Sequence, residues 1–153
     1  MDEQNTEIAY QRYGSNLYRL SYMMLQDKHD AEDVVQEVFI KYMMKSPVFN
    51  SEEHEKAWLL RVCSNICKNR IRFRIFHKTL SLEEVNLIDD NSVYQDTLSE
   101  LLDLPVKYRE VFVLHYVEGY KCNEVGKILN VTEVAVKKRL ERGRLILRKE
   151  KDK

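Results

Sequence analysis

The chain of 153 residues is 44% hydrophobic and 33% charged, and its 25 Lys and Arg balance its 25 Asp and Glu. This length suits one domain or two small ones, and the composition indicates a folded, soluble chain rather than a disordered one. Four glycines and two prolines are too few for the turns of a many-stranded sandwich or barrel, so we expect an all-α fold. No run of about 18 apolar residues is present, so no transmembrane helix is expected.

Two features predict a cytoplasmic location. The first five residues are acidic and polar, unlike the basic start of a secretory signal. The three cysteines are an odd number, and they do not make the framework of a disulfide-rich secreted domain. We therefore expect a protein of the reducing cytoplasm.

Charge is segregated along the chain although its net value is zero. Residues 1–60 carry six bases and eleven acids, whereas residues 61–80 carry six bases and no acid. Residues 81–105 carry seven acids and no base, and residues 137–153 carry nine bases and three acids. Two basic blocks separated by an acidic one indicate two regions that bind a polyanion and a spacer that does not. The alternative is that each basic block is a solvated helix face.

Apolar residues at helical spacing predict three helices in the first half of the chain. The first covers residues 6–25 and buries a stripe of Ile8, Tyr13, Leu17, Leu20 and Met24. The second begins near Asp27 or Asp30, either of which can cap it, and ends before Pro47. Its stripe consists of Val34, Val35, Val38, Phe39, Tyr42 and Met43.

A third helix follows the loop 46–51, with Asn50 and Glu53 spaced as a capping box at its start. Its apolar side consists of Trp58, Leu59, Val62, Ile66 and Phe73. Its other side combines amides with cations: Arg61, Asn65, Lys68, Asn69 and Arg72. Amides read base edges and an exposed aromatic such as Phe49 stacks on an unpaired base, so this helix fits single-stranded or melted DNA. Phe49 equally fits a plug of the bundle, and Trp58 fits the core better than a base platform.

The stretch 77–95 is acidic and lacks helical periodicity, which predicts a linker. A short helix is expected near 93–104, before Pro105. A longer helix is expected over 108–118, where Gly119 ends it as a C′ glycine.

The remaining residues have the pattern of a helix-turn-helix, with a short helix over 123–129, a turn over 130–132 and a basic helix over 133–149. Thr132 is placed to cap the second helix. The expected core is Val125, Leu129, Val131, Val136, Leu140 and Leu147, and the outward positions are Lys137, Lys138, Glu141 and Arg142. In the major groove, Lys and Arg donate to guanine and Glu accepts from cytosine.

Two other classes of protein fit parts of this pattern. A one-component regulator that uses the helix-turn-helix as a dimer would explain that motif, but it does not explain the Asn and Arg side of the third helix. A metal-binding helical protein or enzyme would use Cys63, Cys67, His54 and His77, but apolar neighbours suit buried thiols. No nucleophile–base set, glycine-rich phosphate loop or carboxylate pair is present. We therefore expect no enzyme activity, no cofactor, no metal and no small-molecule substrate.

Two groups of motifs resemble bacterial RNA polymerase sigma factors of the sigma-70 family. Three segments resemble the second sigma domain: DAEDVVQEVF at 30–39, KAWLLRV at 56–62, and Asn65. Four segments resemble the fourth domain: Leu104-Pro105, YREVF at 108–112, NEV at 123–125 and VKKRL at 136–140. Together they resemble the compact extracytoplasmic-function (ECF) group, which keeps only these two domains.

The resemblance implies two small helical domains, with a three-to-four-helix bundle over residues 1–76 and the helix-turn-helix domain over 96–153, joined by the linker 77–95. It implies an initiation factor that binds core RNA polymerase through the β′ clamp helices and the β flap. The residues that match the polymerase contact are Asp33, Gln36, Glu37 and Lys41. A solvated acidic helix start is the alternative. Promoter DNA and an anti-sigma factor are the other implied partners.

The same resemblance assigns DNA contacts. The residues that would open the −10 element and hold its strand are Phe49, Arg61, Asn65, Lys68, Asn69 and Arg72. Those that would lie at the −35 duplex are Thr132, Lys137, Lys138, Glu141 and Arg142. Gly126 replaces the alanine usual in the family, and we expect it to weaken its helix by about 1 kcal/mol. Asn130 replaces a glycine and keeps the left-handed turn, while Gly143 permits close packing.

Overall fold

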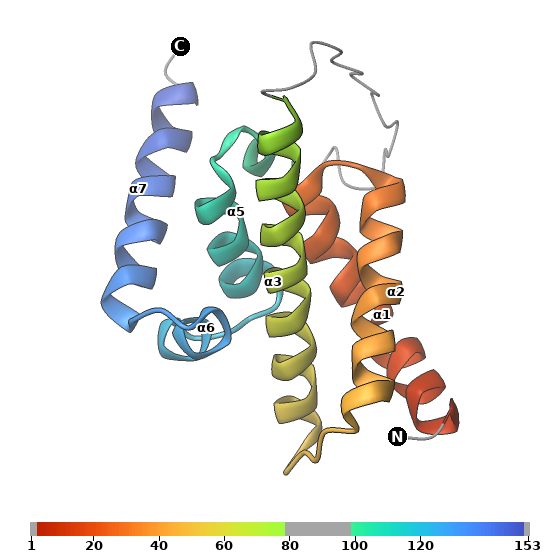
Figure 1. The fold of residues 1–153 in the computed structure, drawn as a ribbon. Coiled ribbons are helices and arrows are strands. Elements are labelled where there is room, and N and C mark those ends of the chain that lie inside the picture. The colour runs from red at the N-terminus through yellow and green to blue at the C-terminus, as the bar shows by residue number, and fades with distance from the viewer. Residues whose placement is uncertain (1–2, 79–98, 152–153) are drawn as a thin grey trace. The chain divides into compact units, whose positions relative to one another are not determined.

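The computed structural model describes residues 3–78 and 99–151, and every regular element in them is a helix (Figure 1). The predicted all-α fold is therefore confirmed. The chain divides into two compact units, Met1–Asp89 and Asp90–Lys153. The predicted domain boundaries remain predictions, because most of the predicted linker lies outside the described residues. None of the described helices is both long and apolar enough to cross a membrane.

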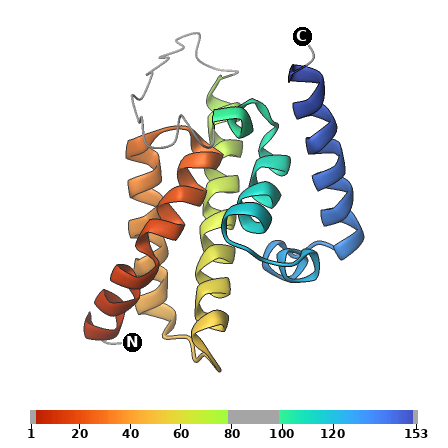
Figure 2. The same cartoon turned by 180° about the vertical axis from the view of Figure 1, so that it is seen from behind.

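The described residues of the first unit form a bundle of three helices that pack on one another pairwise (Figure 1; Figure 2): α1 (Glu3–Leu25), α2 (Lys28–Lys45) and α3 (Glu52–Lys78). Its core is filled by apolar side chains from all three helices, among them Leu17, Leu20, Met23, Val34, Val38, Tyr42, Leu59 and Leu60. Because α3 packs on both other helices, its buried residues determine which of its sides faces solvent.

Three residues predicted in the apolar stripes are exposed instead. Ile8 is 46% exposed because the α1 stripe passes through its buried neighbour Ala9. Met43 is 39% exposed at the edge of the α2 stripe. Phe73 is 64% exposed because it lies beyond Cys67, the last buried side chain among those described in α3.

Side-chain caps fix the starts of α2 and α3. Asp27, rather than Asp30, caps α2, because its Oδ1 accepts from the Asp30 N–H at 2.9 Å. Ser51, rather than the predicted Asn50, caps α3, because its Oγ accepts from the His54 N–H at 3.1 Å. Asn50 instead donates its own N–H to His54 Nδ1 at 3.2 Å.

The described part of the second unit begins with three consecutive helical elements: a 3₁₀ turn η1 (Ser99–Asp103), α5 (Val106–Phe112) and a π-helical continuation η2 (Val113–Val117). Of the helix predicted near 93–104, residues 93–98 lie outside the described residues. The described remainder forms only the short η1. Gly119 has a φ of 81°, which confirms the predicted helix-ending glycine.

The predicted helix-turn-helix is formed by α6 (Cys122–Leu129) and α7 (Glu133–Lys151). Asn130 takes the left-handed conformation with a φ of 59°, as predicted. Thr132 caps α7 as predicted, because its Oγ1 accepts from the Ala135 N–H at 3.1 Å. Four predicted core residues are buried, namely Val125, Leu129, Val136 and Leu140, and two are only half-buried, namely Val131 and Leu147.

Two glycines permit close approaches in this unit. A Cβ on Gly126 would lie 2.7 Å from the Val131 carbonyl oxygen. This glycine therefore allows the turn to pack closely against α6, in addition to weakening the helix. A Cβ on Gly143 would overlap Cε2 of Phe112, so this glycine makes room for the ring between α5 and α7. The close packing predicted for Gly143 is confirmed.

Substituting Gly143→Ala is expected to lower the free energy of unfolding by about 1–2 kcal/mol, because overpacking against Phe112 outweighs the gain in helix propensity. Gly14→Ala is the matched control, since its Cβ would meet only the Tyr10 ring at 3.9 Å. That control is expected to raise stability by about 0.5–1 kcal/mol. Urea unfolding followed by far-UV circular dichroism measures both. A Gly143→Ala protein as stable as the control would contradict the packing argument.

Candidate nucleic-acid and polymerase interfaces

One side of α3 presents amides and cations to solvent. Its exposed members recur at steps of three or four residues, Arg61, Asn65, Asn69 and Arg72, with Lys68 half-buried beside them. Arg72 Nη1 donates to Asn69 Oδ1 at 3.2 Å, which orients the amide. The opposite side of the helix is buried through Leu59, Leu60, Cys63 and Cys67. The structure therefore brings five of the six residues predicted for single-stranded DNA onto one helix face.

The sixth residue, Phe49, lies in the loop before α3 within a cluster of rings. It stacks nearly parallel to Tyr42 at 6.1 Å between ring centroids and meets the edges of Trp58 at 5.8 Å and His54 at 5.3 Å. Phe49 and Trp58 are both half-buried. Phe49 thus packs on the bundle and also lines an open pocket of about 470 Å³ that reaches Ile8 on α1.

Polar contacts fasten the start of α3 to its neighbours. The Tyr42 hydroxyl donates to Glu55 Oε2 at 2.7 Å, and burial together with this carboxylate raises the pKa of Tyr42. Arg12 Nη1 lies 3.1 Å from Glu52 Oε1, and the Tyr13 hydroxyl donates to the Glu52 carbonyl at 3.1 Å. These contacts hold the loop in place beside the amide and cation face of α3.

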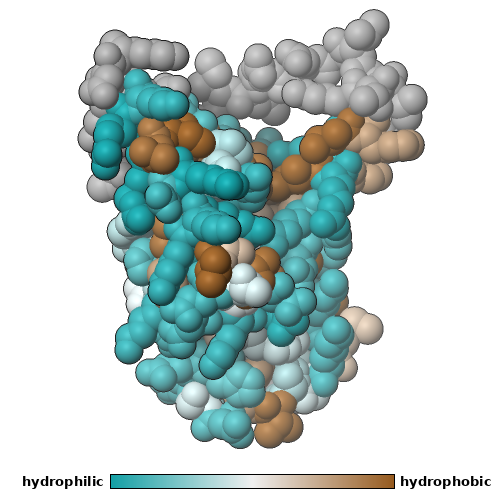
Figure 3. Space-filling view, turned by 90° about the vertical axis from the view of Figure 1, so that its left-hand side faces the viewer, coloured by the Kyte–Doolittle hydropathy of each residue, from teal (hydrophilic) through white to brown (hydrophobic). Residues whose placement is uncertain are grey.

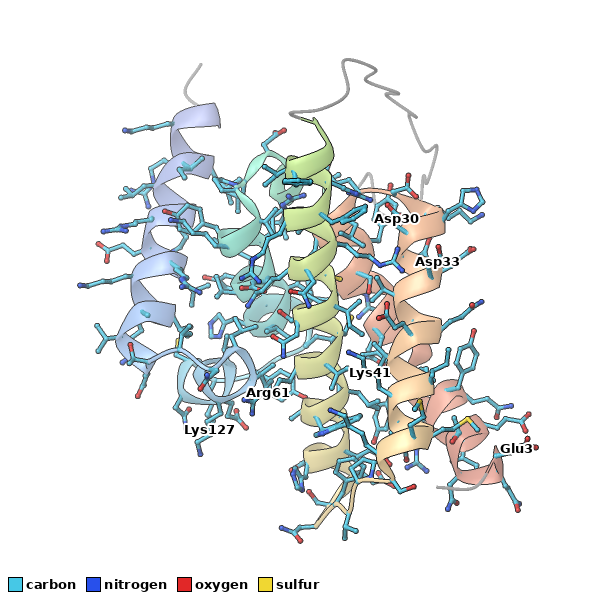
Figure 4. The ribbon with its side chains drawn as sticks, in the orientation of Figure 1. Glu3, Asp30, Asp33, Lys41, Arg61 and Lys127 are labelled. Carbon is cyan, nitrogen blue, oxygen red and sulfur yellow. The ribbon has the colours of Figure 1, made fainter. Side chains whose placement is uncertain are left out.

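The predicted polymerase residues divide between two sides of α2. Asp33 points away from α3 (Figure 4), and Asp33 and Gln36 are exposed. Glu37 and Lys41 turn toward α3, where they line a groove of about 320 Å³. The outward side also carries two apolar residues that the sequence analysis did not assign to an interface: Ile40 and Met44, exposed at 55% and 79%.

A chain of ion pairs joins α2 to α3. Arg70 lies 3.7 Å from Asp30 Oδ1 through Nη1 and 3.6 Å from Glu37 Oε2 through Nη2. Arg74 pairs with the other Asp30 oxygen and donates to the Leu25 carbonyl at 2.8 Å. Two acids of α2 therefore neutralise part of the basic block of α3. The sequence gives no sign of this pairing, since the partners lie more than thirty residues apart.

The recognition helix α7 presents its cations opposite its buried side. Lys137, Lys138, Glu141 and Arg142 are exposed, as predicted, whereas Val136 and Leu140 are buried. Figure 3 turns the side that carries α7 toward the viewer, and hydrophilic residues cover most of it. Lys137 Nζ pairs with Glu133 Oε1 at 3.3 Å.

Val134 lies on this exposed face of α7 and was missed by the sequence analysis. Its side chain is 61% exposed in the first turn of the helix. At i, i+4 and i+7 spacing it shares a face with Lys138 and Glu141. The signal that could have found it is an apolar residue at polar-face spacing.

The residues proposed for a metal site are not brought together. Cys63 is buried, and its Sγ lies 3.0 Å from Ser21 Oγ. His54 is exposed about two and a half turns away along α3, where its Nδ1 accepts from Asn50. The side chain of His77 lies outside the described residues. Within residues 3–76 and 101–149, no three His, Cys, Asp or Glu side chains group as metal ligands.

Comparison with known proteins accounts for both units. Residues 9–74 match the family model "Sigma-70 region 2", and residues 95–147 match "Sigma-70, region 4". The "ECF RNA polymerase sigma factor SigW" of Bacillus subtilis (strain 168) is 32% identical over 157 residues, covering 90% of this chain and 84% of that protein. The factor SigM of the same organism is 31% identical, covering 88% of each chain. The chain belongs to the ECF sigma factors.

Two solved structures share the fold of this sigma factor. The sigma factor RpoE in complex with the anti-sigma factor NepR from Bartonella quintana superposes with a TM-score of 0.77 at 21% identity, covering 95% of this chain and 96% of that one. CnrH in complex with the cytosolic domain of CnrY gives 0.73 at 24% identity, covering 99% and 90%.

Membership in this family confirms the predicted function class. The protein is a non-enzymatic sigma factor that binds core RNA polymerase and directs it to promoters. The dimeric one-component regulator is not favoured, because it accounts only for the helix-turn-helix. Here the first unit matches sigma region 2 and the second matches sigma region 4.

Replacing Tyr42 by Phe in this sigma factor is expected to lower the free energy of unfolding by about 1 kcal/mol at pH 8, through loss of the bond to Glu55. Because the folded state raises the Tyr42 pKa above its usual value near 10, the protonated phenol stabilises the fold below that pH. This stabilisation is lost as the pH rises further. Urea unfolding followed by Trp58 fluorescence should show the wild-type advantage shrinking above pH 10. A difference that grows with pH would contradict the assignment.

Proposed function

We propose that this sigma factor divides promoter recognition among three helix faces. The outward side of α2 docks on the clamp helices of the polymerase β′ subunit, α3 captures the unpaired −10 strand, and α7 reads the −35 element as duplex. The observation that carries the proposal is the exposed face of α3, where two amides lie between two arginines on the side opposite the buried one.

The α3 face suits a single strand better than a closed duplex. Asn65 and Asn69 offer donors and acceptors to a base edge, and the bond from Arg72 fixes the Asn69 oxygen. Arg61, Lys68 and Arg72 supply cations for phosphates. Flipping a base from the stack costs a few kcal/mol, and a site that accepts one base turns this cost into specificity. Phe49 borders this region from the loop.

The α7 face suits the major groove. Lys137, Lys138 and Arg142 donate to guanine or to phosphates, and Glu141 accepts from cytosine N4. Thr132 lies at the cap, where a hydroxyl can bond a phosphate as well as the Ala135 N–H. Val134 offers methyl groups to a thymine C5-methyl. A β-branched side chain has one favoured rotamer in a helix, so Val134 loses little conformational entropy when it makes this contact.

The outward side of α2 combines charge with apolar surface. Asp33 and Gln36 begin the face, and Ile40 and Met44 continue it at helical spacing. Glu37 and Lys41 flank it on the side of α3. An acidic start followed by exposed apolar residues fits a basic and apolar helix surface on polymerase.

An anti-sigma factor is the further partner we propose. The two solved structures described above are complexes, one with the anti-sigma factor NepR and one with the cytosolic domain of CnrY. We propose that this protein acts in the cytoplasm, where polymerase and the chromosome lie.

The test is transcription from genomic fragments with purified core polymerase, with and without this protein. Specific start sites should appear only when it is present. Asn65→Ala and the double change Lys137→Ala with Lys138→Ala should each reduce them by about 5- to 150-fold, as expected for loss of one good base contact. Lys56→Ala, half-buried near the start of α3 and outside the proposed contacts, is the control. Tight operator binding without polymerase and no stimulation would refute the sigma mechanism.

A thymine-to-uracil scan of the −35 element found in that experiment tests Val134. Removing the C5-methyl at one position should weaken binding of the holoenzyme by about three- to fivefold. Val134→Ala should be weakened to the same extent on the thymine promoter and be insensitive to that uracil. Lys138→Ala is the control, because it should lose affinity while keeping the sensitivity. Uracil scans that look alike for wild type and Val134→Ala would exclude the contact.

A further inference from the structure

We infer that Arg70 contacts a phosphate of the promoter backbone. In the free factor an ion pair with Glu37 occupies Arg70, and polymerase binding to Glu37 frees it for DNA. The inference rests on the proposed function, because it joins the polymerase face of α2 to the DNA face of α3. It adds a residue that the sequence assigned to neither face.

Arg70 is held by charge alone and loosely. Its guanidinium lies 3.6 Å from Glu37 and 3.7 Å from Asp30, at side chains that are 32–43% exposed. Pairs with this exposure are weak and exchange readily with another anion. Arg74, one turn further on, differs because it also donates to the Leu25 backbone carbonyl at 2.8 Å. Arg74 is therefore an anchor of the bundle, and Arg70 is the exchangeable member of the pair.

Arg70 is also placed beside the proposed DNA face. It lines the groove of about 320 Å³ between α2 and α3 together with Asn69, which belongs to that face, and with Lys41 and Glu37 of α2. A phosphate that passes Asn69 along this rim would meet two cations, Arg70 and Lys41. Glu37 lies in the same groove and opposes an anion there. Removal or engagement of the Glu37 carboxylate thus changes the charge that DNA meets.

The two partners compete for one ion pair. Glu37 is a proposed polymerase contact, and its carboxylate cannot be fully engaged by polymerase and by Arg70 together. When polymerase takes Glu37, Arg70 keeps only Asp30, which it shares with Arg74. By linkage, polymerase binding raises the affinity of Arg70 for phosphate, and bound DNA raises the affinity for polymerase by the same factor.

The test compares Glu37→Gln with Asp33→Asn in the full-length protein without polymerase. Both remove one acid from the proposed polymerase contacts of α2, but of the two only Glu37 is paired with Arg70. The probe is a fluorescent single-stranded dT12, which reports phosphate contacts irrespective of sequence. Glu37→Gln should bind it about two- to fivefold more tightly than Asp33→Asn. Its salt dependence should also be steeper by about 0.7 in log–log slope, which is one added phosphate contact.

The Arg70→Gln background supplies the control for mechanism. In this background Glu37→Gln should no longer raise the affinity for dT12, because the Arg70 cation that the substitution would free is absent. Arg70→Gln should bind core polymerase at least as tightly as wild type, and its unfolding midpoint should show that the fold is kept. Equal dT12 affinities for Glu37→Gln and Asp33→Asn, or a gain that persists without Arg70, would overturn the inference. Failure of wild type to bind core polymerase would instead overturn the proposed function.

Discussion

The burial of one side of each long helix is the constraint on which both proposed DNA-binding surfaces depend. In α3, Leu59, Leu60, Cys63 and Cys67 pack into the bundle, and the helical period of 3.6 residues then places Asn65 on the opposite side. In the second unit the buried side of α7 runs through Val136, Leu140 and Gly143, which turns Val134 and Lys138 outward. On both helices the backbone that carries these side chains is anchored by the buried side behind it, and only Phe49 and the cap Thr132 lie outside the helices.

Local signals made much of this fold predictable. The cap at Thr132, the left-handed Asn130 and the helix-ending Gly119 each act through bonds within a few residues, and each appears where the sequence predicted it. Caps with two candidates were harder to predict: α3 begins at Glu52, so Ser51 rather than Asn50 directly precedes it, and the Ser51 Oγ accepts from the His54 N–H. Periodicity also locates the centre of an apolar stripe but does not say how wide its buried part is. Ile8 lies at the edge of the stripe, so it was predicted in the core but is exposed.

The candidate sites were predictable in residue type and less so in pairing. The amide and cation pattern of α3 and the cations of α7 follow from sequence, because spacing on one helix determines which residues share a face. The partners of Arg70 come from another helix, and no local pattern encodes them. The predicted apolar stripe of α2 leaves out Ile40 and Met44, and an apolar residue outside a stripe does not indicate an interface until its exposure is known.

Charge gives a physical reason to expect that tight promoter binding by this factor requires polymerase. The zero net charge of the chain means that its basic surfaces gain little from long-range attraction, and acids of α2 lie within reach of cations of α3 in the first unit. Each exposed ion pair is worth no more than about 1 kcal/mol, whereas unstacking a base costs a few. Under the proposed division of contacts, the free energy that opens the promoter is assembled from α2, α3 and α7 together, and polymerase is the partner that allows all three sets of contacts to be made at once.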